Sequence, residues 1–115
     1  VFLSDKSADI YNQKTLRSMQ GSHFHLPIYR GPILEMVETC KKQDLPVLAT
    51  TLSEVSVDYK AVKTDGNFAL VMGNEGQGIS KEMAESANQL VHINMPGQAE
   101  SLNVAVAAGI LMFSL

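Results

Sequence analysis

Two glycine-rich segments, each placed between an apolar run and a helix-like stretch, constrain the fold of this chain more than any other feature. The first is residues 70–80 (LVMGNEGQGIS) and the second is residues 93–103 (INMPGQAESLN). Each follows a short strand-like run, turns at glycine and then opens a helix. Such units predict an open α/β sheet, in which cofactors bind at the carboxyl ends of the strands. Two of them close in sequence predict two walls of one pocket.

The rest of the chain also alternates between the two patterns. Apolar runs predict strands at 1–4, 25–29, 45–50, 68–72 and 90–95. Helical stripes and end signals predict helices at 12–20, 32–42, 80–87 and from 101 or 102 to about 113. The polar stretch 53–67 predicts no regular element. This alternation predicts a parallel sheet with helices on both of its faces.

Composition sets limits on size and class. A chain of 115 residues, with 45% hydrophobic and 18% charged residues, predicts one globular domain over 1–115. The longest apolar stretch, Val104–Phe113, is shorter than the roughly 20 residues that span a bilayer, so no membrane segment is expected. Cys40 is the single cysteine, which predicts a core position and fits a reducing cytoplasm. The net charge of −3 argues against unaided nucleic-acid binding.

The chemistry of the two segments leaves alternatives open. The glycines of 73–78 have the spacing G-x-x-G-x-G, which matches neither the dinucleotide nor the P-loop pattern, so they mark either a tight turn or a nucleotide site. Glu75 is either a positioned carboxylate or a solvated acid. Ser101 suits a helix N-cap. Asn103 is harder to explain by packing, because the helix that follows is apolar.

The histidines do not indicate a metal site. His23 and His25 are expected to share one face of a strand, but no cysteine or carboxylate cluster accompanies them, and His92 is distant in sequence. Surface or hydrogen-bonded histidines are therefore predicted, and no metal.

Together with residues 9–22 (DIYNQKTLRSMQGS) and 24–28 (FHLPI), the two segments resemble the SpoU (TrmH-like) branch of the SPOUT RNA methyltransferases. The resemblance covers essentially the whole chain. The family's first motif, an Asn/Gly-rich turn followed by an Ile-Arg-Thr type helix, is absent before Val1. The resemblance thus implies an N-terminally truncated α/β catalytic domain with a deep trefoil knot, acting as a homodimer.

The resemblance also implies a reaction and a set of residues. The reaction is S-adenosylmethionine-dependent 2′-O-ribose methylation of ribosomal or transfer RNA. The residues implied for the cofactor are Thr50, Gly73, Asn74, Gly76, Ile93, Met95 and Leu102. Those implied for the catalytic pocket are Glu75, Ser101 and Asn103, and Lys14 and Arg17 are candidates for RNA contact.

Two other classes stay open: a catalytically inactive SPOUT-type binding or dimerisation module, and another nucleotide-binding α/β enzyme. In the family, an arginine of the first motif assists removal of the hydroxyl proton. We therefore expect residues 1–115 alone not to methylate RNA, whereas a longer protein containing that motif should.

Overall fold

The computed structural model describes residues 1–73, 78–94 and 103–115. Two compact units share these residues, one formed by 1–36 and the other by 37–115. The strands are β1 (Phe2–Ser4), β2 (Tyr29–Gly31), β3 (Val47–Thr50), β4 (Val57–Asp58), β5 (Ala69–Val71) and β6 (Gln89–His92). The α-helices are α1 (Gln13–Met19), α2 (Ile33–Lys42), α3 (Lys81–Ser86) and α4 (Val104–Ser114), and two 3₁₀ turns are η1 (Ser22–Phe24) and η2 (Tyr59–Ala61).

In the first unit, β1 and β2 pair in parallel, with Phe2 opposite Tyr29, and α1 lies between them in sequence. The side chain of Asn12 accepts a hydrogen bond from the Thr15 amide at 2.9 Å and so caps the start of α1. The helix ends where Gln20 (φ 48°) and Gly21 (φ 85°) adopt left-handed conformations. The predicted helix over 12–20, stopped at Gly21, is confirmed.

The predicted strand over 25–29 is wrong in its position. The chain forms the 3₁₀ turn η1 at Ser22–Phe24, and the strand β2 begins only at Tyr29. Pairing decides this, because the β1 ladder starts at Phe2, whose partner is Tyr29, and the Tyr29 amide donates to the Val1 carbonyl at 2.9 Å. His23 and His25 therefore lie in a turn and do not share one face of a strand.

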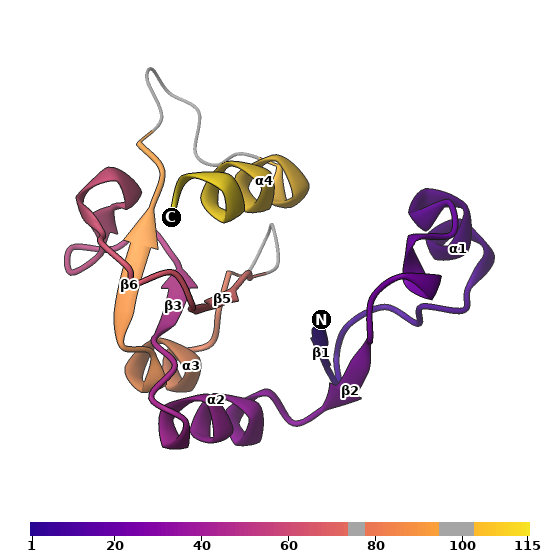
Figure 1. Cartoon of the computed structure of the whole chain (residues 1–115), viewed down its shortest axis with the longest axis horizontal. Coiled ribbons are helices and arrows are strands. Elements are labelled where there is room, and N and C mark those ends of the chain that lie inside the picture. Colours follow the sequence, from indigo (N-terminus) through magenta and orange to yellow (C-terminus); the bar gives the residue numbers. More distant parts are fainter. Residues whose placement is uncertain (74–77, 95–102) are drawn as a thin grey trace. The chain divides into compact units, whose positions relative to one another are not determined.

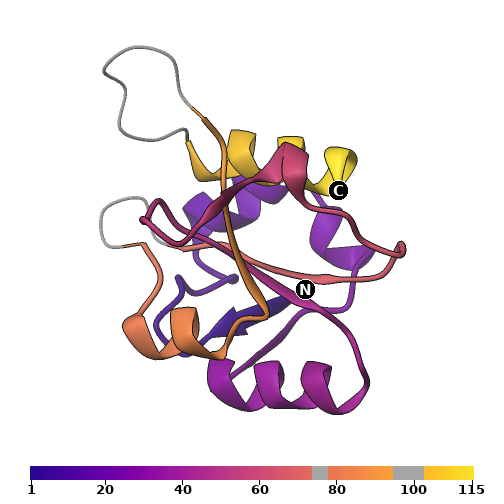
Figure 2. The same ribbon diagram turned by 90° about the vertical axis from the view of Figure 1, so that its left-hand side faces the viewer.

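In the second unit, four parallel strands form one sheet in the order β4-β6-β3-β5. The central strand β3 is paired on both sides, and its Val47 and Ala49 are fully buried. A strand buried on both faces is apolar throughout, which is why its sequence lacks alternation. The predicted parallel sheet is confirmed, and Figures 1 and 2 show α4 beyond the end toward which β6 runs.

Strand β4 was not predicted, because it lies in the polar stretch 53–67. It has only two residues, which pair with β6 by placing Val57 opposite Val91 and Asp58 opposite His92. A strand this short has no periodicity of its own, so only its partner defines it. The strand predicted at 90–95 is β6, which begins at Gln89 and ends at His92.

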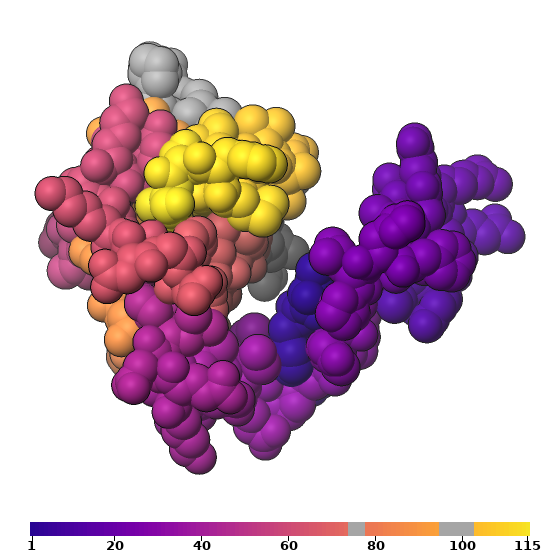
Figure 3. Space-filling model, viewed as in Figure 1, coloured from indigo at the N-terminus to yellow at the C-terminus, as the bar shows by residue number. Residues whose placement is uncertain are grey.

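The helices of the second unit follow their end signals with one exception. The Ser80 hydroxyl accepts from the Met83 amide at 3.1 Å and caps α3, as predicted. Helix α4 begins at Val104 with Asn103 as its N-cap, later than the predicted start at 101 or 102. Figure 3 shows α4 at the surface of this unit. None of the helices in the described residues is long and apolar enough to cross a membrane.

Candidate functional site at the carboxyl edge of the sheet

Three neighbouring strands of the second unit end at the same edge. Because β5, β3 and β6 run in parallel and adjacent, Thr50 at the end of β3 lies opposite Val91 of β6, and Ala49 lies opposite Val71 of β5. Gly73 follows β5 by two residues, and Ile93 directly follows β6. The structure therefore brings Thr50, Gly73 and Ile93 together, three of the residues that the resemblance implied for a cofactor.

The side chain of Thr50 ties two of these strands together. Its hydroxyl donates to the Val71 carbonyl of β5 at 3.1 Å, and the next amide, that of Thr51, donates to the Val91 carbonyl of β6 at 3.0 Å. The hydroxyl hydrogen is thus used within the sheet, while the oxygen keeps its capacity to accept. These two hydrogen bonds hold the ends of β5, β3 and β6 in register.

Gly73 is a glycine for a reason internal to the chain. A Cβ atom built on Gly73 would lie 2.5 Å from the Gly78 carbonyl carbon and 2.7 Å from the Ile79 nitrogen. Real Cβ atoms do not approach backbone so closely, so no other residue fits at position 73 without displacing the backbone of Gly78 and Ile79. Gly78 itself has a left-handed φ of 67°. The sequence left open a tight turn or a nucleotide site, and the close approach of the Gly78 and Ile79 backbone by itself already requires glycine at position 73.

Asn103 caps helix α4. Its side-chain oxygen accepts from the Ala105 amide at 2.9 Å and the Val106 amide at 3.4 Å. Asn is among the best N-cap residues because it satisfies amides that have no partner within the helix. The N-cap role predicted for Ser101 therefore belongs to Asn103 in the described part of the chain. A catalytic role for Asn103 stays a prediction.

Six of the predicted site residues lie outside the described residues: Asn74, Glu75, Gly76, Met95, Ser101 and Leu102. The two candidates for RNA contact are described, and they belong to the first unit. Lys14 and Arg17 are both exposed on α1, and a spacing of three places them on one face of that helix.

A polar network at the same edge was missed by sequence reasoning. His92 Nδ1 lies 2.9 Å from Ser56 Oγ, and His92 Nε2 lies 3.0 Å from Asn94 Oδ1. The Asn94 amide group donates in turn to a carboxylate oxygen of Asp58. The signal in the sequence was weak: His92 and Asn94 are two residues apart at a strand end, and such positions point to the same side.

The remaining candidates are metal ligands and the cysteine. No three His, Cys, Asp or Glu side chains among residues 1–73, 78–94 and 103–115 come together as metal ligands. Cys40 is buried on α2, as predicted for a core residue.

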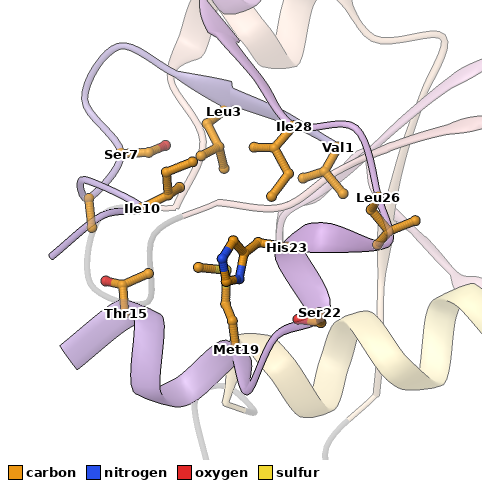
Figure 4. A pocket seen from close by; sticks show the side chains of 11 residues that line it. Val1, Leu3, Ser7, Ile10, Thr15, Met19, Ser22, His23, Leu26 and Ile28 are labelled. Atoms are coloured by element: carbon orange, nitrogen blue, oxygen red, sulfur yellow. The ribbon is translucent and has the colours of Figure 1, made fainter. Parts of the chain in front are cut away.

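The first unit contains a hollow of about 330 Å³, shown in Figure 4. Apolar side chains, among them Leu3, Ile10 and Ile28, make up most of its lining. The His23 ring points into it, and its Nδ1 is buried with no hydrogen-bond partner in the part of the chain that the structure describes. Its apolar walls offer little that would orient a polar substrate.

Comparison with known proteins adds the family context. A sequence model of the SpoU rRNA Methylase family matches residues 1–113. The chain is 43% identical over 115 residues to the 23S rRNA (guanosine(2553)-2′-O)-methyltransferase of Bacillus subtilis, covering 100% of this chain and 46% of that protein. It is 40% identical over 96 residues to the tRNA (guanosine(18)-2′-O)-methyltransferase of Aquifex aeolicus, covering 82% and 45%.

The fold has a counterpart among solved structures. The crystal structure of an AdoMet-bound rRNA methyltransferase from Sinorhizobium meliloti matches with a TM-score of 0.90 and 34% identity, covering 98% of this chain and 43% of that one. The chain thus spans less than half the length of the curated relatives it matches.

Proposed function

The chain belongs to the SpoU rRNA Methylase family, and on that basis we propose that its carboxyl-edge site binds S-adenosylmethionine for 2′-O-methylation of ribose in ribosomal or transfer RNA. One observation carries the proposal: Thr50, Gly73 and Ile93, which belong to three separate strand ends, meet at one edge of a parallel sheet. That edge is where open α/β sheets bind cofactors.

The residues at this edge suit such a ligand. Its adenine ring has apolar faces and hydrogen-bonding nitrogens at its edge, which apolar side chains and backbone groups at strand ends can contact. Ile93 is half-buried and offers an apolar side chain beside its backbone groups, and the Thr50 oxygen retains acceptor capacity. We propose that Asn74, Gly76, Met95 and Leu102 complete this cofactor site, and that Glu75, Ser101 and Asn103 line the adjoining catalytic pocket.

S-adenosylmethionine supplies an electrophilic methyl group on a sulfonium sulfur. The protein's task is alignment, because an in-line displacement requires the ribose 2′-oxygen opposite the leaving sulfur. The 2′-hydroxyl proton must leave as the new C–O bond forms. Among the described residues at the edge, both ring nitrogens of His92 and both carboxylate oxygens of Asp58 are engaged in hydrogen bonds, and we assign the role of proton acceptor to neither.

We further propose that residues 1–115 belong to one catalytic domain and form part of it, which the family match over 1–113 supports, and that this domain has the family's trefoil knot. We also propose that the protein is cytoplasmic, needs no metal and contacts RNA through Lys14 and Arg17. We propose in addition that it forms a homodimer. The support for dimerisation is α4, an apolar helix on which Val106, Met112 and Phe113 are 51%, 58% and 93% exposed. Val106 and Phe113 are seven residues apart and so share one face of the helix, with Met112 beside Phe113, and exposed apolar residues grouped in this way favour an interface.

Calorimetric titration with S-adenosylmethionine tests the site. We expect Ile93→Arg to weaken binding more than tenfold, because the long charged side chain occupies the edge. Gln89→Arg is the matched control, since Gln89 is exposed at the opposite end of the same strand β6. Its affinity should stay within twofold of the unsubstituted protein. Equal affinity for Ile93→Arg and Gln89→Arg, with unchanged melting temperatures, would place the cofactor elsewhere.

The reaction is tested with tritiated S-adenosylmethionine and unmodified ribosomal or transfer RNA, comparing the 115-residue chain with the longer protein. We expect incorporation by the longer protein at a ribose 2′-oxygen and none by the shorter chain. Binding without transfer by both would favour an inactive binding module. Incorporation that maps to a base would refute the proposed reaction.

A further inference from the structure

Four polar side chains from three segments meet beside the end of strand β6. Ser56 comes from the turn between β3 and β4, Asp58 ends β4, and His92 and Asn94 come from the end of β6 and just beyond it. His92 is half-buried and lies at the centre, with Nδ1 at 2.9 Å from Ser56 Oγ and Nε2 at 3.0 Å from Asn94 Oδ1. Each ring nitrogen of His92 therefore has a side-chain hydrogen-bond partner.

The outer end of the network orients Asn94. A carboxylate only accepts hydrogen bonds, so the group of Asn94 that faces Asp58 must be its NH₂. The Asn94 oxygen then faces His92, and Nε2 must carry the hydrogen in that contact. The other Asp58 oxygen accepts from the Lys60 amide at 2.9 Å and caps η2. Asp58 is thereby held in place itself.

The inner end holds a turn. Ser56 Oγ accepts from the Ser53 amide at 3.0 Å and lies 2.9 Å from the Ser53 carbonyl, so it closes the turn 53–56 on itself. Its third contact is His92 Nδ1. These hydrogen bonds within the turn 53–56 fix the position of Ser56 Oγ. The His92 ring is therefore linked through Ser56 to that turn.

Ile93 lies between the two ends of this network. Its neighbours in sequence are His92, paired with Asp58 in the sheet, and Asn94, linked to the Asp58 carboxylate. We propose that His92 is a positioning residue: by holding Asn94 on one side and Ser56 on the other, it sets the backbone of Ile93 against the turn 53–56. This inference rests on the proposed function, because it is the cofactor wall at Ile93 that His92 would align.

Two substitutions at His92 separate the arms of the network. In a glutamine the side-chain nitrogen reaches the place of Nε2 and keeps the donor to Asn94, whereas in an asparagine it stands near Nδ1 and keeps only the Ser56 arm. His92→Phe keeps the ring shape and removes both arms. Glu54→Gln is the matched control, because Glu54 is exposed in the same turn and its side chain makes no hydrogen bond among the described residues.

The measurement is the dissociation constant for S-adenosylmethionine, taken together with the melting temperature of each variant. We expect about a tenfold loss of affinity for His92→Phe and for His92→Asn, near the upper end of what one hydrogen bond contributes. His92→Gln and Glu54→Gln should stay within threefold of the unsubstituted protein. Rescue by Gln and not by Asn identifies the Asn94 arm, which a general packing role would not distinguish.

A second variant guards against misfolding at a half-buried position. Asn94 is exposed, so Asn94→Ala removes the acceptor without opening the core. We expect it to lose about as much affinity as His92→Phe, and the double variant to lose no more than either, because both interrupt one path. Additive losses, or affinities unchanged in all variants, would overturn the inference. No binding by the unsubstituted protein would instead overturn the proposed function.

Discussion

Different interactions stabilise the two units of this chain. All eight of the buried apolar residues in the described chain belong to residues 37–115. The first unit, residues 1–36, has a parallel strand pair, one capped helix and a hollow of about 330 Å³, but none of its residues is buried. Hydrogen bonds shape the first unit, both in its turns and between distant residues, as in those that Arg30 donates to the Ser4 and Ser7 carbonyls, whereas burial stabilises the second. Identical substitutions should therefore have different consequences in the two units.

Replacing one leucine in each unit by alanine tests this difference in burial. Leu111 on α4 is 1% exposed, and we expect Leu111→Ala to lower the free energy of unfolding by about 2–5 kcal/mol through lost burial and a cavity. Leu26 of the first unit is 55% exposed, and Leu26→Ala should cost less than about 1 kcal/mol. Urea unfolding followed by circular dichroism measures both. Similar losses for the two variants would show that the first unit has a core of its own.

The contrast between glycines lies within the second unit. A methyl group on Gly73 would meet backbone at 2.5 Å, whereas one on Gly109 in α4 meets nothing within 4 Å. We expect Gly73→Ala to destabilise the turn by about 1–3 kcal/mol and to weaken cofactor binding. Gly109→Ala should stabilise the protein by about 0.5–1 kcal/mol, since alanine favours a helix interior. Thermal melting measures both effects, and a stabilising Gly73→Ala would contradict the close approach of the Gly78 and Ile79 backbone to Gly73.

The smallest effect concerns two equivalent caps. Asn12 caps α1 in the first unit, and Asn103 caps α4 in the second. Each substitution to alanine should cost its helix about 1 kcal/mol. Amide hydrogen exchange locates the effect: we expect Asn12→Ala to speed exchange only in α1, while Asn103→Ala also lowers global stability, because α4 carries the buried Leu111. A global effect of Asn12→Ala would show that the stability of the two units is coupled.

Elements with local signals could be predicted from the sequence. The cap at Ser80, the helix stop at Gly21 and the stripe leading to Val37 and Cys40 are encoded within a few residues of where they act. The apolar run that contains β3 needs no partner to be identified, because its short length, the proline before it and its β-branched Val47 and Thr50 favour a buried strand over a helix. The family resemblance then named Thr50, Gly73 and Ile93, whose meeting at one edge follows from a parallel sheet.

What the sequence determined by itself is therefore local: capping, turn and burial preferences, together with the family pattern of its two glycine-rich segments. Tertiary structure decided the rest. The two residues of β4 become a strand only by pairing with β6, and Gly73 is required only because the chain returns to it at Gly78 and Ile79. His92 gains its partners from positions 36 residues away and two residues away at once. Contacts between residues distant in sequence depend on how the sheet assembles, and no local pattern records that.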